Sequence, residues 1–339
     1  MNFTSLLLVV CMRLIFPALV SSSEPCSSLQ YYDADFDVSV NTPAFSKHSG
    51  SRPVVVIDSA HNNFHTRSGN FRPFSDLLQS DGYIVKDSEG LYSEFEAELL
   101  EGIDILVVAN ALNDANVDPE DCKGAWGYPH PSAFSDKELS ELLSWIKAGG
   151  ALMLIADHSP FAGGSTTLAE ALGVVLGGGL TLYADKLLHF MEFSATEQPL
   201  DGLLSPHPIL QGRSQETESV TSVVTFNGEA FWSQPKAKVR PLMILGNQAT
   251  TYYLSTGDNI TAESLSKTAS VSSYGMLQGA TLRLGQGRVA IFGEAAMFSA
   301  QLAGPNKNIK MGMNNEHAPG NKQFTLNVLH WLSGLLPEN

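Results

Sequence analysis

The sequence predicts an α/β fold with a mostly parallel sheet covered by helices on both faces. Short continuous apolar runs such as 54–57 are typical of strands that are buried on both faces. Amphipathic helical segments alternate with these runs from residue 54 to residue 172, which favours parallel strands joined by helices. Hydrophobic residues make up 43% of the 339 residues and charged residues only 16%, so the chain can fill a large core.

The first half of the predicted domain alternates strictly between strands and helices. Strands are expected at 54–57, 83–85, 103–109 and 151–156. Helices are expected from 71 to 78, after Ser93 and after Ser135, and a further one is expected to begin near Leu168. Ser93 with Glu96, and Ser135 with Glu138, have the spacing of capping boxes, which mark helix starts.

The C-terminal half predicts an antiparallel extension of the same sheet. Strands are expected at 220–226, 242–245, 280–284 and 289–292. The last two are separated by Gly285-Gln286-Gly287, a spacing typical of a hairpin. The chain ends in an apolar helix for which Asn321 is the expected N-cap.

The N-terminus predicts a secreted protein with a single folded domain. Residues 1–22 form a short apolar segment that ends in serines, which is typical of a signal peptide. A short membrane anchor is the alternative, but Arg13 interrupts the run, and no other segment is long enough to span a membrane. Residues 23–52 are expected to be a polar leader, and 53–336 the single domain.

The cysteines and one sequon fit this extracellular location. Cys11 would leave with the signal peptide, so Cys26 and Cys122 remain as an even pair in an oxidising compartment, and we expect them to form a disulfide. Asn259 begins an Asn-Ile-Thr sequon and is the expected glycosylation site. The formal net charge of −15 disfavours a nucleic-acid partner, so the partners left open are a small molecule or extracellular matrix.

Three blocks of sequence resemble a known superfamily. They are ELSELLSWIKAGGALMLIADHSP at 138–160, GRVAIFGEAAMFSAQ at 287–301 and NKQFTLNVLHWLSG at 321–334. In this order they resemble the secreted or periplasmic, uncharacterised branch of the class I glutamine amidotransferase-like superfamily, which includes the gliding-motility and intraflagellar-transport type domain. The resemblance covers residues 50–335 and implies a flavodoxin-like three-layer sandwich.

The sequence departs from this superfamily at the position of its nucleophile. True amidotransferases carry a cysteine on the tight turn between a strand and a helix. The comparable turn here is Ala156-Asp157-His158-Ser159-Pro160 and has no cysteine. Without a thiolate at this turn the chain is not expected to be a glutamine amidotransferase.

Polar and ionisable residues follow the predicted strands, where open parallel sheets bind ligands. Five of them are expected to line one crevice: Asp58, His61, Asp157, His158 and Glu294. Asn62, Asn110, Asn113, Ser159 and His317 follow strands or lie in loops near the same edge. For any single residue the alternative is a structural cap or turn. No fixed metal-ligand spacing is present, so no cofactor is predicted, with a divalent metal as the alternative.

Two functions from different classes therefore remain open. The first is a secreted protein of unassigned activity that acts as a hydrolase or binds a small ligand at the polar crevice. The second is a non-enzymatic, acidic component of the extracellular matrix or of a mineral surface, which the net charge of −15 would suit.

Overall fold

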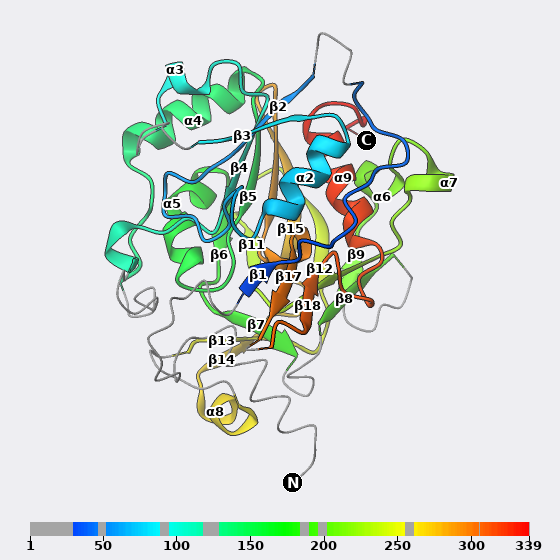
Figure 1. Ribbon diagram of the computed structural model, residues 1–339. Helices are drawn as coiled ribbons and strands as arrows, with labels where there is room; N and C mark the ends of the chain where they lie inside the picture. The colour runs from blue at the N-terminus through cyan, green and yellow to red at the C-terminus, as the bar shows by residue number, and fades with distance from the viewer. Residues whose placement is uncertain are drawn as a thin grey trace.

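Five parallel strands form the centre of the protein (Figure 1). In the computed structural model, which describes residues 30–46, 52–88, 95–117, 129–183, 190–195, 202–254, 261–304 and 306–338, these strands are adjacent and mutually parallel. Their order is β3 (Ile84–Asp87), β2 (Val54–Ile57), β4 (Ile105–Ala109), β5 (Ala151–Ile155) and β16 (Gly287–Phe292). The predicted buried parallel strands are confirmed.

The antiparallel extension is also confirmed and is larger than predicted. Beyond β16 the described part of the sheet continues with β15 (Leu277–Leu284), β12 (Val239–Leu245), β9 (Gly202–Leu204), β8 (Met191–Ser194) and β10 (Ser222–Thr225). Neighbouring strands in this part are antiparallel except β9 and β8, which are parallel. Leu284 pairs with Gly287, so β15 and β16 form the predicted hairpin. β11 (Phe231–Ser233) pairs with both β15 and β6 (Val174–Leu176), off the main path.

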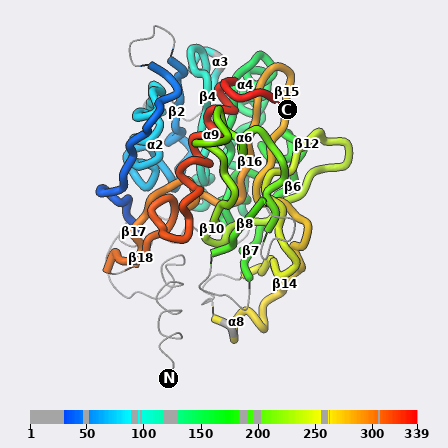
Figure 2. Tube along the Cα trace, turned by 90° about the vertical axis from the view of Figure 1, so that its right-hand side faces the viewer, coloured from blue at the N-terminus to red at the C-terminus, as the bar shows by residue number. Residues whose placement is uncertain are grey.

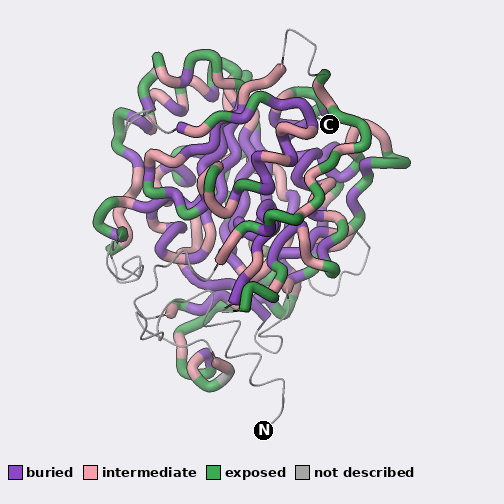
Figure 3. Tube along the Cα trace, in the orientation of Figure 1, coloured by how far each residue is buried: buried purple, intermediate pink, exposed green. Residues whose placement is uncertain are grey.

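Helices cover both faces of the sheet, so the fold is a flavodoxin-like three-layer sandwich (Figures 1 and 2). Alternate strand residues point to opposite faces. Ile57, Met153 and Ile155 pack on one face with the side chains of α2 (Arg72–Ser80) and α9 (Asn321–Leu332). On the other face, strand residues pack with α4 (Asp136–Ala148) and α5 (Phe161–Ala171). Figure 3 shows the sheet as the buried centre of the molecule.

Two helix starts differ from the sequence prediction. Helix α5 begins at Phe161 and not near Leu168, so Gly164 lies inside it. The glycine is needed there because the helix lies close to the chain after β4: a Cβ on Gly164 would lie 2.3 Å from Ala111 O. Helix α9 begins at Asn321 itself, with Gly320 as N-cap, so the expected Asn321 cap is wrong. The Asn321 side chain instead accepts from Val224 N at 2.9 Å and donates to Val224 O at 2.7 Å, which fixes α9 to β10.

Of the two predicted capping boxes, one lies within the described residues and the other begins outside them. The capping box of Ser135 and Glu138 is present at the start of α4 and is confirmed. Helix α3 (Ala97–Leu100) has Glu96 as N-cap, while Ser93 lies outside the described residues.

The described part of the polar leader, residues 30–46, packs on the domain. β1 (Gln30–Tyr32) pairs with β17 (Ala300–Ala303), which pairs with β18 (Ile309–Gly312). Near the end of its described part, the leader packs against Gly82. A Cβ on Gly82 would lie 1.9 Å from Phe45 O, so only glycine permits this approach. Phe36, Val38, Val40 and Phe45 of the leader therefore pack with side chains of α2 and α9.

The remaining described elements lie around this sandwich. A small sheet has the order β14 (Ser270–Ser272), β13 (Ala249–Tyr252) and β7 (Leu180–Tyr183), and the short helices are α6 (Pro208–Gln211), α7 (Gln215–Glu218), α8 (Ala262–Lys267), η2 (Asp114–Asn116) and η4 (Ala296–Phe298). Among the described residues, no helix has the length and hydropathy needed to cross a bilayer. The predicted signal peptide (1–22), Cys26, Cys122 and Asn259 lie outside the described residues.

Candidate functional site

The carboxyl ends of β2, β4, β5 and β16 meet at one edge of the sheet, because these strands are parallel. Asp58, Asn110, Asp157 and Glu294 each lie close behind one of these ends. The side chains of Asp58, Asp157 and Glu294 belong to two groups. We call Asp58, His61 and Glu138 the His61 cluster, and Asp157, Glu229 and Glu294 the carboxylate cluster.

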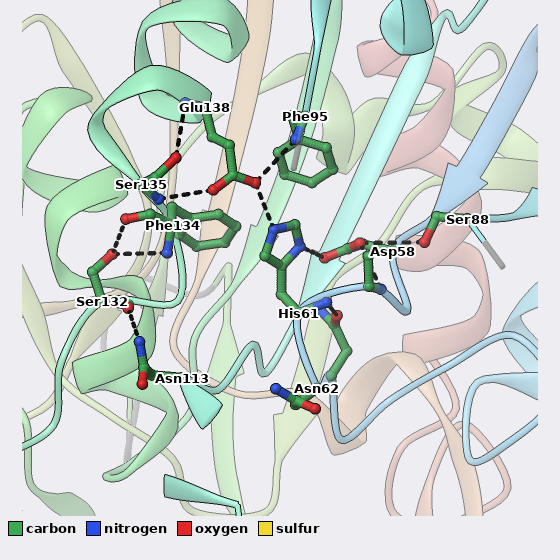
Figure 4. Close-up of polar contacts among 12 residues, drawn as sticks. Asp58, His61, Asn62, Ser88, Phe95, Asn113, Ser132, Phe134, Ser135 and Glu138 are labelled. Carbon is green, nitrogen blue, oxygen red and sulfur yellow. Dashed lines mark hydrogen bonds and ion pairs between the residues drawn. The ribbon is translucent and has the colours of Figure 1, made fainter. Parts of the chain in front are cut away.

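The imidazole of His61 bridges two carboxylates (Figure 4). His61 Nδ1 lies 2.8 Å from Asp58 Oδ2, and His61 Nε2 lies 2.9 Å from Glu138 Oε1. The ring lies between Phe95 and Phe134, with centroid distances of 4.6 and 4.7 Å. Asp58, His61 and Glu138 are only 0%, 4% and 2% exposed, so the cluster is closed to solvent.

The charges of this cluster stabilise one another. Burial alone would lower the pKa of His61, but the hydrogen bonds to Asp58 and Glu138 raise it to about 9. Burial likewise acts to raise the pKa of Glu138, but the hydrogen bonds from His61 and from main-chain N–H groups lower it overall. At neutral pH His61 is therefore an imidazolium that donates from both ring nitrogens.

The remaining oxygens of the His61 cluster are also occupied. Asp58 Oδ1 accepts from Ala60 N at 3.1 Å and from Ser88 Oγ at 3.3 Å. Glu138 accepts from Phe95 N at 2.9 Å and from Ser135 N at 2.8 Å. A buried group whose protons and lone pairs are all used stabilises the structure, and here it joins the loop after β2 to the start of α4.

The asparagines near this edge have structural partners. Asn110 has a φ of 58°, and its Oδ1 accepts from Asp157 N at 3.0 Å, which links the loops after β4 and β5. Asn62 donates to Asp114 Oδ1 at 2.8 Å. Asn113 caps η2 by accepting from Ala115 N at 2.9 Å and donates to Ser132 O at 2.6 Å. All three hold loops in place.

His158, Ser159 and His317 are not arranged for nucleophilic catalysis. His158 Nδ1 lies 2.9 Å from the main-chain oxygen of Ser159, and Ser159 Oγ donates to Gly178 O. The hydroxyl proton of Ser159 is thus directed at a carbonyl, which is no general base. The side chain of His317 is 58% exposed, and its ring stacks on Phe190 at 4.7 Å.

The second group, the carboxylate cluster, begins with Asp157 and Glu294. Asp157 Oδ1 accepts from His158 N at 2.8 Å, and Oδ2 accepts from Ala295 N at 3.3 Å. The two oxygens of Glu294 accept from Ala296 N and Met297 N, both at 2.8 Å, and so hold the start of η4. Glu294 is buried, whereas the side chain of Asp157 is 14% exposed and marks the solvent side of the cluster.

Glu229, which the sequence analysis did not single out, completes the carboxylate cluster. It is 0% exposed; Oε1 accepts from Gly178 N at 2.9 Å, and Oε2 has no hydrogen-bond partner among the described residues. Gly228-Glu229 packs directly against Gly293-Glu294, and Glu229 N donates to Gly293 O at 2.7 Å. A Cβ on Gly228 would lie 2.4 Å from Gly293 O, so the close approach needs glycine there. The repeated Gly-Glu dipeptide is the signal that could have pointed to Glu229.

Burial and like charge act together in this cluster. Burial first, and then the negative charge of Asp157, raise the pKa of both Glu229 and Glu294 well above that of an ordinary glutamate. Within the described ranges no lysine or arginine forms an ion pair with any of the three acids. A protonated acid beside an ionised carboxylate can both donate and accept hydrogen bonds, and such pairs are found at acid–base sites.

Four of the five predicted residues thus belong to two clusters at one edge of the sheet. Asp58 and His61 belong to the closed cluster, and Asp157 and Glu294 to the carboxylate cluster, with Asn110 hydrogen-bonded between the loops. That all five predicted residues line one crevice stays a prediction. In the described part of the chain no three His, Cys, Asp or Glu side chains are placed to hold a metal ion.

Comparison with solved structures identifies the fold. The mmIFT52 N-terminal domain has a TM-score of 0.53 and 13% identity, with 82% of this chain and 97% of that chain covered. The cytoplasmic protein STM3548 from Salmonella typhimurium has a TM-score of 0.45 and 12% identity, with 83% of this chain and 98% of that chain covered. A ThuA-like protein from Bacteroides uniformis has a TM-score of 0.41 and 11% identity, with 89% of this chain and 95% of that chain covered. No family model matches the sequence, and no curated protein does. The similarity is one of fold and assigns no activity.

Proposed function

We propose that the protein is secreted and binds a small polar molecule at the carboxyl edge of the sheet, around Asp157. The observation that carries this proposal is Oε2 of Glu229, which is buried, feels the charge of Asp157 and has no hydrogen-bond partner among the described residues. Buried polar atoms in proteins are almost always hydrogen-bonded, so an unpaired one calls for a partner atom. A ligand that reaches this edge would supply it.

The position of the cluster supports the same conclusion. In open α/β sheets ligands bind beyond the carboxyl ends of the strands, and Asp157 and Glu294 follow two such ends. Asp157, Ser159 and Gly178 are partly exposed, so they form the side from which a ligand would enter. Hydrolysis of a bound substrate would use the same residues, since one acid can donate a proton and Asp157 can accept one.

The location and the finer family assignment belong to this proposal. The apolar segment before residue 22 supports secretion. The three sequence blocks, together with the fold shared with the mmIFT52 N-terminal domain, support membership of the secreted or periplasmic branch of the amidotransferase-like superfamily. Glutamine hydrolysis is not proposed, because the turn at 156–160 contains no cysteine.

A fragment screen by ligand-observed NMR tests the binding proposal. Fragments that bind the wild-type protein should lose binding to Asp157→Asn but not to Glu141→Gln, a carboxylate-to-amide control on α4. Asp157→Asn should stay folded, since removing a like charge relieves Glu229 and Glu294. If all fragments bind both variants equally, the site is elsewhere. Broad, weak calcium binding with no fragment bound would favour the acidic matrix protein instead.

A further inference from the structure

The carboxylate cluster holds three acids and little to balance them. The partners of Asp157 and Glu294 are mainly main-chain N–H groups, and Glu229 has one such partner on Oε1. His158 lies nearby, with Nε2 3.8 Å from Asp157 Oδ1. An anion would be repelled here, whereas a cation would find the partly exposed carboxylate of Asp157 and a buried acceptor oxygen on Glu229.

The surroundings favour an organic cation over a metal ion. The described His, Cys, Asp and Glu side chains provide no set of three that would hold a metal, and Ca²⁺ takes at least six oxygen ligands. An aromatic side chain lies beside the turn that binds Glu229 Oε1: Trp232 is 41% exposed, and its ring lies 3.8 Å from the position that a Cβ on Gly177, the neighbour of Gly178, would take. Exposed indole rings attract organic cations through cation–π contacts.

We propose that the ligand of this site is a small organic cation with an ammonium group, and that its binding displaces the proton of Glu229. This inference rests on the proposed function. Glu229 Oε2 loses its proton to the solvent and accepts an N–H from the ammonium group, while Asp157 accepts a second. No covalent bond forms between ligand and protein, and one proton leaves for each cation that binds.

The groups that face Glu229 make this exchange specific. Asp157, on the loop after β5, is the charged group that acts on it, and the turn after β6 contributes only main-chain N–H groups. Gly293, after β16, contributes a carbonyl to Glu229 N. A bound cation therefore favours the ionised form of Glu229, since it offsets the charge of Asp157 and pairs with the buried carboxylate.

Isothermal titration calorimetry with matched probes tests the proposal. The probes are ethanolamine, 1,4-diaminobutane and benzylamine as hydrochlorides, ethylene glycol as the neutral counterpart of ethanolamine, and calcium chloride. Titration in buffers of different ionisation enthalpy counts the protons released. We expect the amines to bind with release of about one proton, ethylene glycol not to bind, and amine affinity to rise with pH.

Variants separate this inference from the proposed function. Glu229→Gln should weaken amine binding about tenfold to a hundredfold and abolish proton release, because the neutral amide cannot ionise. The Glu141→Gln control should bind as the wild type. Amines that bind without proton release, equal binding of ethylene glycol, binding of calcium alone, or no amine binding would each overturn the inference. Asp157-dependent binding of neutral fragments would at the same time leave the proposed function standing.

Discussion

Replacing Glu138 by glutamine should change how stability depends on pH. The imidazolium of His61 is paired with two carboxylates, and its pKa is raised from 6.5 to about 9. A group whose pKa is higher in the folded state contributes its full stabilisation when the pH is below its pKa in the unfolded state. This contribution is lost as the pH rises through its pKa in the folded state. The His61 cluster is thus worth about 3 kcal/mol below pH ~6.5, and this is lost as the pH rises to ~9.

Glu138→Gln removes one of the two charges that hold the proton on His61, while burial of the ring stays the same. The pKa of His61 should fall towards its ordinary value, so the free energy of unfolding should decrease less between pH ~6.5 and pH ~9. The variant should also be less stable near pH ~6, by about 1–3 kcal/mol. The reason is that the amide NH2 of glutamine takes the place of a carboxylate oxygen that accepts a hydrogen bond from Ser135 N or Phe95 N.

Urea denaturation followed by circular dichroism, at several pH values between ~6 and ~9, measures this difference. Glu141→Gln makes the same chemical change on the same helix and should parallel the wild type. Glu229 and Glu294 also lose stabilisation as the pH rises, but equally in all three proteins, so their effect cancels. An unchanged pH dependence in Glu138→Gln would refute the doubly paired imidazolium.

Three further predictions concern the chain as a whole. Asp157→Asn should leave the melting temperature unchanged or raised, because the like charge beside Glu229 is removed; a fall of many degrees in a thermal scan would make Asp157 a structural cap. Cys26 and Cys122, 122 − 26 = 96 positions apart, should form a disulfide worth roughly 4–5 kcal/mol, and two free thiols in unreduced peptide mass spectra would contradict it. Glutamine should release no ammonia above a Cys26→Ser, Cys122→Ser control.

The parts of the fold that local patterns determine could be predicted from the sequence. The strand at 54–57, the hairpin around Gly285-Gln286-Gly287 and the capping box of Ser135 agree with the structure. Each depends on a few neighbouring residues whose apolar or turn-forming character is strong.

The features that failed depend on contacts between distant residues. Gly164 lies inside α5 because it packs against Ala111, and Asn321 binds Val224 instead of capping α9. The same reason hid one of the three residues in each cluster. Glu138 meets His61 across 77 positions and was visible only as a helix cap, and Glu229 was not noticed because its role depends on packing against Gly293.

A crystal structure with a bound fragment tests the central claim most directly. The fragment should be one that fails to bind Asp157→Asn. The account predicts a polar ligand atom within ~3.2 Å of Glu229 Oε2, where the described residues provide no partner, and a second contact to Asp157. A buried water alone at Glu229 Oε2, with the fragment bound away from Asp157, would contradict it.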